Sequence, residues 1–272
     1  MRTPRLAIIA GALASVFVAG TAHAAVAAPA SKPALAKNPI HKTGRLALRT
    51  CEEPPVQSGT EDEARVYFEA VLECLDKAWG PKVKQAGFAF GKPKFRVITK
   101  AGAPTGCGPF PGDEQAQALY CPVNKTMTLL LSPNVVAKPS DPVLMLVVAH
   151  EYGHHVQKLT GMLRHDKHGA YVLANPRSLE PVRRAELQAE CYAGAFMGSV
   201  WDSLGRSQKE FDSLLKGTHD RFDVSALGIK TRSSADLSHG SDANVVWWLK
   251  RGFTGRSAGS CNTWAAPKSR VS

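Results

Sequence analysis

The sequence lacks several features that would place it in other classes of protein. It has no C-x-x-C pair, so a zinc site built from cysteines is the weaker alternative. It shows no recognised nucleic-acid-binding module and no pattern of stacking aromatic residues, so we expect no nucleic-acid partner. Its first apolar run, Leu6–Gly20, is short for a membrane span and is interrupted by Gly11. No cysteine follows that run to carry a lipid, so we expect neither a transmembrane nor a lipid anchor.

The first 24 residues have the form of a secretory signal peptide. Arg2 and Arg5 precede the apolar run, and Ala22-His23-Ala24 follows it as a cleavage site of the A-x-A type. Residues 25–48 are rich in Ala, Pro and Lys without an acidic residue, and we expect a disordered leader or short pro-segment there. Residues 49–272 suit one domain with a substantial core. We therefore expect a secreted, extracellular protein.

The central feature is an H-E-x-x-H motif within an apolar stretch. That stretch begins at Asp141-Pro142, a typical helix start, and predicts a helix of about five turns. His150 and His154 then lie one turn apart on one face, with Cβ atoms about 6 Å apart. Two neutral imidazoles at that spacing can bind one zinc ion. Glu151 lies where its carboxylate can take a proton from a water on the metal without itself binding the metal.

A zinc hydrolase needs a third protein ligand and one open coordination position. The extended metzincin motif would need glycine and histidine where this chain has Gln157 and Thr160, which excludes that class. The other common source of the third ligand is a glutamate on a later helix.

A second helical segment, residues 184–204, carries two such glutamates. Glu186 and Glu190 form an i, i+4 pair on one face, and the small residues Ala189 and Ala193 would let another helix approach closely. A like-charge pair at this spacing destabilises an isolated helix. A cation opposite the pair, or a histidine bound to one, would explain it. The alternative is two solvated glutamates on a surface helix.

At these residues the chain resembles the putative neutral zinc metallopeptidases, a family of the gluzincin kind. The resemblance implies that His150, His154 and Glu186 are the zinc ligands and that Glu151 is the general base. It implies that Glu190 orients a ligand histidine, although the family pattern has the shorter aspartate there. The matching segments are HEYGHHVQ at 150–157, RAELQAECYAG at 184–194, GCGPF and LYCP around Cys107 and Cys121, and SHGSDANVVWWLKRGFTGRSAGSCNTW at 238–264.

Six cysteines in an exported chain indicate a disulfide framework, for which fifteen connectivities are possible. The resemblance implies that Cys191 pairs with Cys261, and this bond would fix the C-terminal segment beside the helix that bears Glu186. His239 in that segment could then stabilise the oxyanion of a tetrahedral intermediate. A turn histidine bonded to the backbone is the alternative. The resemblance also implies that Cys107 pairs with Cys121. With these two pairs made, Cys51 is left to pair with Cys74.

The remaining elements complete an α+β fold. Apolar periodicity predicts a helix from Glu61 to Trp79. Residues 94–99 and 126–131 read as strands, and 118–121 as the start of a hairpin. We expect a zincin-like domain with the motif helix, a second helix bearing the glutamate, a small sheet and stabilising disulfides. In such a domain an edge strand, which we place at 126–132, commonly holds an extended peptide.

Residues 81–100 contain six basic side chains and no acidic one. One interpretation is attraction to an anionic cell-envelope surface or acidic polymer. The alternative is a solvated face of a basic protein. Among the other histidines, His155 must point away from the metal face, and the loop residues His165 and His168 are expected to be exposed.

These observations predict a secreted zinc-dependent peptidase that acts on a peptide or protein, with zinc as its cofactor and Glu151 as the general base. Two alternatives remain open. One is a secreted binding or scaffold protein with little or no turnover, which a fourth side chain such as His239 closing the site would indicate. The other is a cell-wall amidase that uses the same zinc chemistry.

Overall fold

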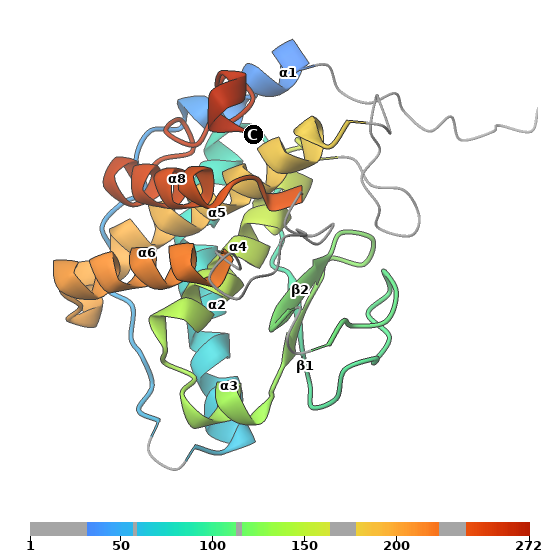
Figure 1. Cartoon of the computed structure of the whole chain (residues 1–272), viewed down its shortest axis with the longest axis vertical. Helices are drawn as coiled ribbons and strands as arrows, with labels where there is room; N and C mark the ends of the chain where they lie inside the picture. Colours follow the sequence, from blue (N-terminus) through green and yellow to red (C-terminus); the bar gives the residue numbers. More distant parts are fainter. Residues whose placement is uncertain (1–31, 57–58, 113–115, 164–177, 223–237) are drawn as a thin grey trace, which may run out of the picture.

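The computed structural model describes residues 32–56, 59–112, 116–163, 178–222 and 238–272. Helices form most of the molecule, and a three-stranded sheet stands beside them, to the right in Figure 1. The predicted α+β class is confirmed. None of the helices in these ranges is both long enough and apolar enough to cross a membrane. The predicted signal peptide, 1–24, and the histidines His165 and His168 lie outside the described residues.

Helices α2 and α4 begin where their capping residues predict. Thr60 forms a capping box at the start of α2 (Glu61–Gln85), which runs one and a half turns beyond the predicted end. The Asp141 side chain accepts a hydrogen bond from the second residue of α4 (Pro142–Leu159). Helix α4 therefore has the extent that the H-E-x-x-H motif requires for both histidines to share one face.

Helix α5 (Glu180–Val200) begins earlier than predicted and continues through the 3₁₀ turn η2 (Trp201–Leu204). It ends at Gly205, whose left-handed φ of 64° suits a residue without a Cβ. The other helical elements of the described ranges are α1 (Lys32–Ala36), η1 (Pro39–Lys42), α3 (Pro133–Ala137), α6 (Gln208–Phe222), α8 (Asp242–Gly255) and η4 (Lys268–Arg270).

The core holds α4 between α5 and α2. On the α2 side, the Tyr152 hydroxyl donates a hydrogen bond of 2.6 Å to the buried carboxylate of Asp76. Trp79 packs on Tyr192 of α5, with ring centroids 4.8 Å apart. On the outer side of α5, a Cβ at Gly252 would overlap the backbone of α5, so α8 and α5 touch directly there. Both neighbours of α4 are therefore fixed by buried contacts.

The sheet has the order β1-β3-β2, with β1 parallel to β3 and β2 antiparallel to it. The expected hairpin is confirmed. The prediction that 126–132 is an edge strand is wrong, because β3 is paired on both sides and all its residues are buried. The edge that faces α4 is β2 instead. The strands are β1 (Lys94–Ile98), β2 (Ala118–Cys121) and β3 (Thr126–Leu130).

Residues 32–48, expected to belong to a disordered leader, are folded onto the domain. Ile40 and Leu46 are buried, with 0% and 3% of their surface exposed. The Leu46 N–H donates to the carbonyl of Arg256. The composition of this segment concealed its apolar anchors, to which Leu35 also belongs, and they supply the burial that a disordered leader lacks. Residues 25–31 lie outside the described ranges.

The expected cysteine pairs are those that the structure brings to bonding distance. Their Cα atoms are 5.9 Å apart for Cys51 and Cys74, 5.6 Å for Cys107 and Cys121, and 5.4 Å for Cys191 and Cys261. The last of these joins the middle of α5 to the segment that follows α8. The C-terminal segment is therefore linked covalently to the helix that carries Glu186.

His155 ties α4 to the sheet from a fully buried position. Its Nε2–H donates to the carbonyl of Gly91, just before β1, at 2.7 Å. Its Nδ1 accepts from the Tyr120 hydroxyl of β2 at 2.9 Å. As predicted, this ring points away from the side on which His150 and His154 meet. Burial lowers the pKa of His155 to about 4, so the ring is neutral near pH 7.

The depressed pKa of His155 predicts a loss of stability in mild acid. In the unfolded chain the His155 imidazole has its ordinary pKa of 6.5, whereas in the folded protein the same ring stays neutral down to about pH 4. The stability that the neutral His155 ring contributes to the fold is therefore fully present above pH 6.5 and is lost as the pH falls toward 4. Between pH 7 and 5 the free energy of unfolding of the wild type should fall by about 2 kcal/mol more than that of His155→Gln. Urea titrations of both proteins across this range measure the difference, and parallel pH profiles would contradict the assignment.

Candidate metal centre

Helices α4 and α5 bring His150, His154 and Glu186 to one point. The Nε2 atoms of the two histidines lie 3.2 Å apart. The Glu186 Oε2 lies 3.3 Å from His150 Nε2 and 3.1 Å from His154 Nε2. All three side chains are about nine-tenths buried. The three residues predicted as ligands thus present their donor atoms to a common centre.

His239 reaches the same centre from the segment that precedes α8. Its Nε2 lies 3.3 Å from Glu186 Oε2. The donor atoms of His150, Glu186 and His239 all lie within 4.8 Å of one another, so these residues alone could hold a metal ion. His239 is the most accessible of the group, with 38% of its side chain exposed against 12% for His150. It therefore forms the solvent-facing side of the cluster.

The spacing of these atoms fits zinc. In a tetrahedral site with bonds of about 2.0–2.1 Å, neighbouring ligand atoms are about 3.3–3.4 Å apart. The four donor–donor distances given above fall between 3.1 and 3.3 Å. Imidazole and carboxylate donors also suit zinc chemically. The residues present thus fit the metal that the H-E-x-x-H motif predicts.

The electrostatics of the cluster favour positive charge at its centre. Burial alone would lower the pKa values of His150 and His154, but the adjacent carboxylates outweigh burial and raise both. Burial would likewise raise the pKa of Glu186, but His154, His239 and His150 hold it well below its usual range. Glu186 therefore stays ionised. A divalent cation bound here would replace protons on the histidines.

Each histidine of α4 that is predicted to bind the metal has a partner for its other ring nitrogen. His150 Nδ1 lies 2.9 Å from Oε2 of Glu190, which is 8% exposed. His154 Nδ1 lies 2.9 Å from Oε1 of Gln157. In each pair an Nδ1–H can donate to the oxygen, which leaves the Nε2 lone pair for a metal. Glu190 is thus placed as expected, on the far side of His150.

Glu151 lies beside this cluster on α4. Its Oε2 accepts a hydrogen bond of 2.7 Å from the backbone N–H of Tyr120 in β2. The hydroxyl of the same tyrosine bonds to His155, one turn further along α4. Tyr120 thus holds the edge strand to the helix at two points, and the carboxylate of Glu151 is fixed between β2 and the histidines.

The short distance between the helices depends on Gly153 and Ala189. A Cβ placed on Gly153 would lie 2.9 Å from the Cα of Ala189 and 3.0 Å from its carbonyl oxygen. Such contacts are closer than van der Waals packing allows. The prediction that small residues of α5 admit another helix is confirmed at Ala189.

The sequence did not reveal three residues of this site. Tyr120 holds Glu151 through its backbone, which any residue can do, so no side-chain pattern signals it. Gln157 counted only as evidence against the metzincin motif, and Gln188 stood unremarked between the two glutamates. A polar amide on the buried face of each helix was the available signal for Gln157 and Gln188, since buried amides need hydrogen-bonding partners.

Comparison with known proteins supports the resemblance seen in the sequence. Residues 41–264 match the model of a family described as putative neutral zinc metallopeptidase. The chain is 29% identical over 218 residues to uncharacterized protein YpfJ of Escherichia coli K12, covering 76% of this chain and 73% of that protein. It is 30% identical over 218 residues to uncharacterized protein Rv2575 of Mycobacterium tuberculosis H37Rv, covering 72% and 69%. No solved structure matches.

The contact at Gly153 predicts that a single methyl group will weaken metal binding. Gly153→Ala should push α4 away from α5 and raise the zinc dissociation constant at least about tenfold, because metal ligands must stay within about 0.2 Å of their distances. Gly217→Ala in α6 is the matched control, since Gly217 is exposed and its added Cβ would meet nothing within 4 Å. Competition with a chromophoric chelator measures both constants. Equal affinities in the two variants would contradict the prediction.

Proposed function

We propose, since the chain belongs to the family of putative neutral zinc metallopeptidases, that it is an exported zinc-dependent peptidase. One observation carries this proposal. The donor atoms of His150, His154 and Glu186 converge at the spacing of a zinc site, and the carboxylate of Glu151 is fixed beside them. That arrangement supplies the ligands and the base that hydrolysis of a peptide bond by water requires.

His150, His154 and Glu186 would hold the zinc ion, which supplies the Lewis acidity that makes a water molecule nucleophilic near neutral pH. Glu151 accepts a proton from the attacking water as the new C–O bond forms. It then returns that proton to the amine nitrogen as the C–N bond breaks. The Tyr120 N–H occupies one oxygen of Glu151 and leaves the other for the water.

The substrate would lie along β2. Gln117 accepts a hydrogen bond from Leu130 of β3, so alternation directs the backbone groups of Ala118 and Tyr120 away from β3. Tyr120 is the residue whose N–H reaches Glu151. An extended peptide added to this edge would therefore pass the base and the histidine cluster. We assign to β2 the role that the sequence suggested for 126–132.

The proposal also includes export of the protein and its attraction to an anionic cell envelope. The three disulfides of the described residues are typical of exported proteins and support export, for which residues 1–24 would serve as the signal peptide. In the basic stretch 81–100, Lys84, Lys94 and Lys100 are exposed. Lys92 pairs with Asp76, and Arg96 donates to the backbone of a loop. The exposed lysines could hold the protein on an anionic cell envelope.

His239 favours a second candidate function, a zinc-containing binding protein. Structural zinc sites have four protein ligands, whereas catalytic sites keep one position open. The His239 Nε2 lies at a distance from Glu186 that a fourth ligand would have. Its exposure suits the peptidase instead, because an accessible imidazole can turn toward the oxyanion of a bound substrate. A cell-wall amidase would use the same residues on a different substrate.

The role of Glu151 predicts the effect of Glu151→Gln on hydrolysis. The variant should bind zinc as the wild type does, while its kcat on an unfolded generic protein falls at least about 10²-fold, because the amide cannot accept the proton. Cleavage rates at equal zinc occupancy, and after zinc removal by a chelator, measure this. Cleavage that persists unchanged in the variant would overturn the mechanism.

His239→Ala separates the two candidate functions. If His239 stabilises the oxyanion, kcat should fall about 10²-fold while the zinc dissociation constant stays within about threefold of wild type. If it is a fourth ligand, zinc binding should weaken, and the visible spectrum of the Co²⁺-substituted protein should change with coordination number. The peptidase proposal expects the first result, and the second would favour the binding protein.

A further inference from the structure

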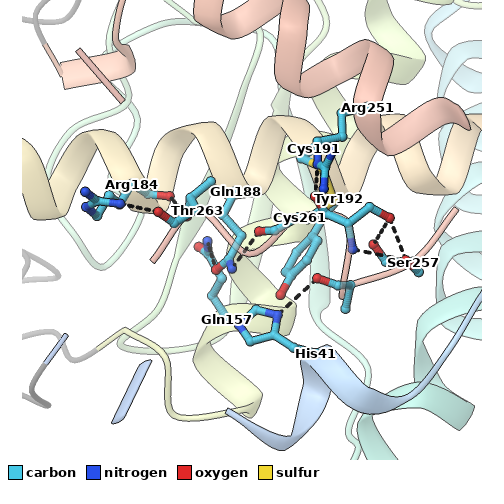
Figure 2. The surroundings of a disulfide bond; sticks show 12 residues. His41, Gln157, Arg184, Gln188, Cys191, Tyr192, Arg251, Ser257, Cys261 and Thr263 are labelled. Atoms are coloured by element: carbon cyan, nitrogen blue, oxygen red, sulfur yellow. Dashed lines mark hydrogen bonds between the residues drawn. A yellow bond between two sulfur atoms is a disulfide. The ribbon is translucent and has the colours of Figure 1, made fainter. Parts of the chain in front are cut away.

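Two buried glutamines connect His154 to the backbone of the C-terminal segment. Gln157 Oε1 faces His154 Nδ1 at 2.9 Å. Gln157 Nε2 donates to the carbonyl of Ala185 at 2.8 Å and to Gln188 Oε1 at 3.0 Å. Gln188 Nε2 donates in turn to the carbonyl of Cys261 at 3.1 Å. Figure 2 shows both glutamines beside Cys261. We call this series of hydrogen bonds the glutamine relay.

The direction of every bond in the relay is set by backbone carbonyls. The oxygens of Ala185 and Cys261 can only accept, so each glutamine must turn its NH₂ group toward them. The amide oxygen of Gln157 then has to face His154. Because that oxygen can only accept, His154 Nδ1 must carry the proton. The lone pair of Nε2 is thereby directed at the point where Glu186 and the other histidines converge.

Burial gives the relay its rigidity. Gln157 and Gln188 are both 0% exposed. A buried amide without partners is costly, so neither side chain can leave its hydrogen bonds for water. An apolar residue of similar size would pack in the same space but would offer His154 no acceptor. The polarity of the two amides therefore matters more than their volume, and the amide oxygen of Gln157 meets His154.

The relay also limits the negative charge of the site. Glu186 and Glu190 already place two carboxylates against His150, and Glu151 lies beside them. Another carboxylate as the partner of His154 would be a fourth negative charge in a poorly solvated region. A neutral amide orients the imidazole equally well without that charge. His150 and His154 are thus held by partners of different kinds, a carboxylate and an amide.

The outer end of the relay is fixed by the Cys191–Cys261 disulfide. Gln188 and Cys191 lie one turn apart on α5, so the bond holds the Cys261 carbonyl beside the helix that carries Gln188. We propose, on the basis of the zinc site assigned above, that Gln157 and Gln188 are positioning residues for His154. The Cys191–Cys261 disulfide anchors them, so the zinc affinity of the active site depends on this bond.

Gln157→Met tests the inner half of the relay. It keeps the size of the side chain and removes the acceptor, and the zinc dissociation constant should rise about 10- to 100-fold, as loss of such a partner generally causes. Thr263→Val is the matched control. Thr263 is fully buried, and its hydroxyl donates a hydrogen bond of 2.6 Å to the Arg184 carbonyl. It therefore joins the same C-terminal segment to α5 without taking part in the relay. It should lower the melting temperature of the zinc-free protein but leave zinc affinity unchanged.

Gln188→Met and the double variant Cys191→Ala/Cys261→Ala test the outer half. Each should raise the dissociation constant by less than Gln157→Met, because Gln157 keeps its bond to the Ala185 carbonyl. Unchanged affinity in Gln157→Met and Gln188→Met, or an equal loss in Thr263→Val, would overturn the relay. Unchanged affinity in the double cysteine variant alone would overturn the role of the disulfide. A wild-type protein that binds no zinc would instead overturn the zinc site, and the relay with it.

Discussion

The close approach of α4 and α5 at Gly153 and Ala189 is the constraint on which the site depends. Zinc-binding geometry tolerates little error, and the proposed ligands His150, His154 and Glu186 come from two different helices. Contact between backbone and a methyl group, without a long side chain between them, leaves the least freedom of position. The packing of α2 and α8 around this pair then holds it closed from both sides.

The sequence was most informative where chemistry follows from the period of one helix. His150, Glu151 and His154 share a helix with readable start signals, so their relative placement could be predicted without the fold. The glutamate pair of α5 was visible for a related reason, because like charges one turn apart need an explanation. The cysteine pairs, and the place of His239 near the cluster, came from the resemblance alone and not from spacing.

The failures concern relations between distant segments. Both β2 and β3 are short and apolar, so no local pattern tells which strand forms the edge. The pairing of β3 with β1 on one side and β2 on the other decides it. The segment 32–48 was misread because composition averages over a few anchoring residues. Gln157 and Gln188 lie 31 positions apart, and only the packed helices bring them together. An isolated polar residue carries no such information.

The docking of residues 36–41 onto residues 258–262 has a consequence for biosynthesis. His41 binds the carbonyl of Ala258, and Asn262 donates to that of Ala36, contacts that span 217 and 226 positions. A polypeptide that emerges amino end first from the ribosome, or from a translocation channel, therefore leaves residues 36–41 without these partners until residues 258–262 have emerged. Closure of so large a loop is slow. Residues 36–41 would dock only after residues 258–262 have been synthesised, and a chain truncated before them would leave that segment undocked.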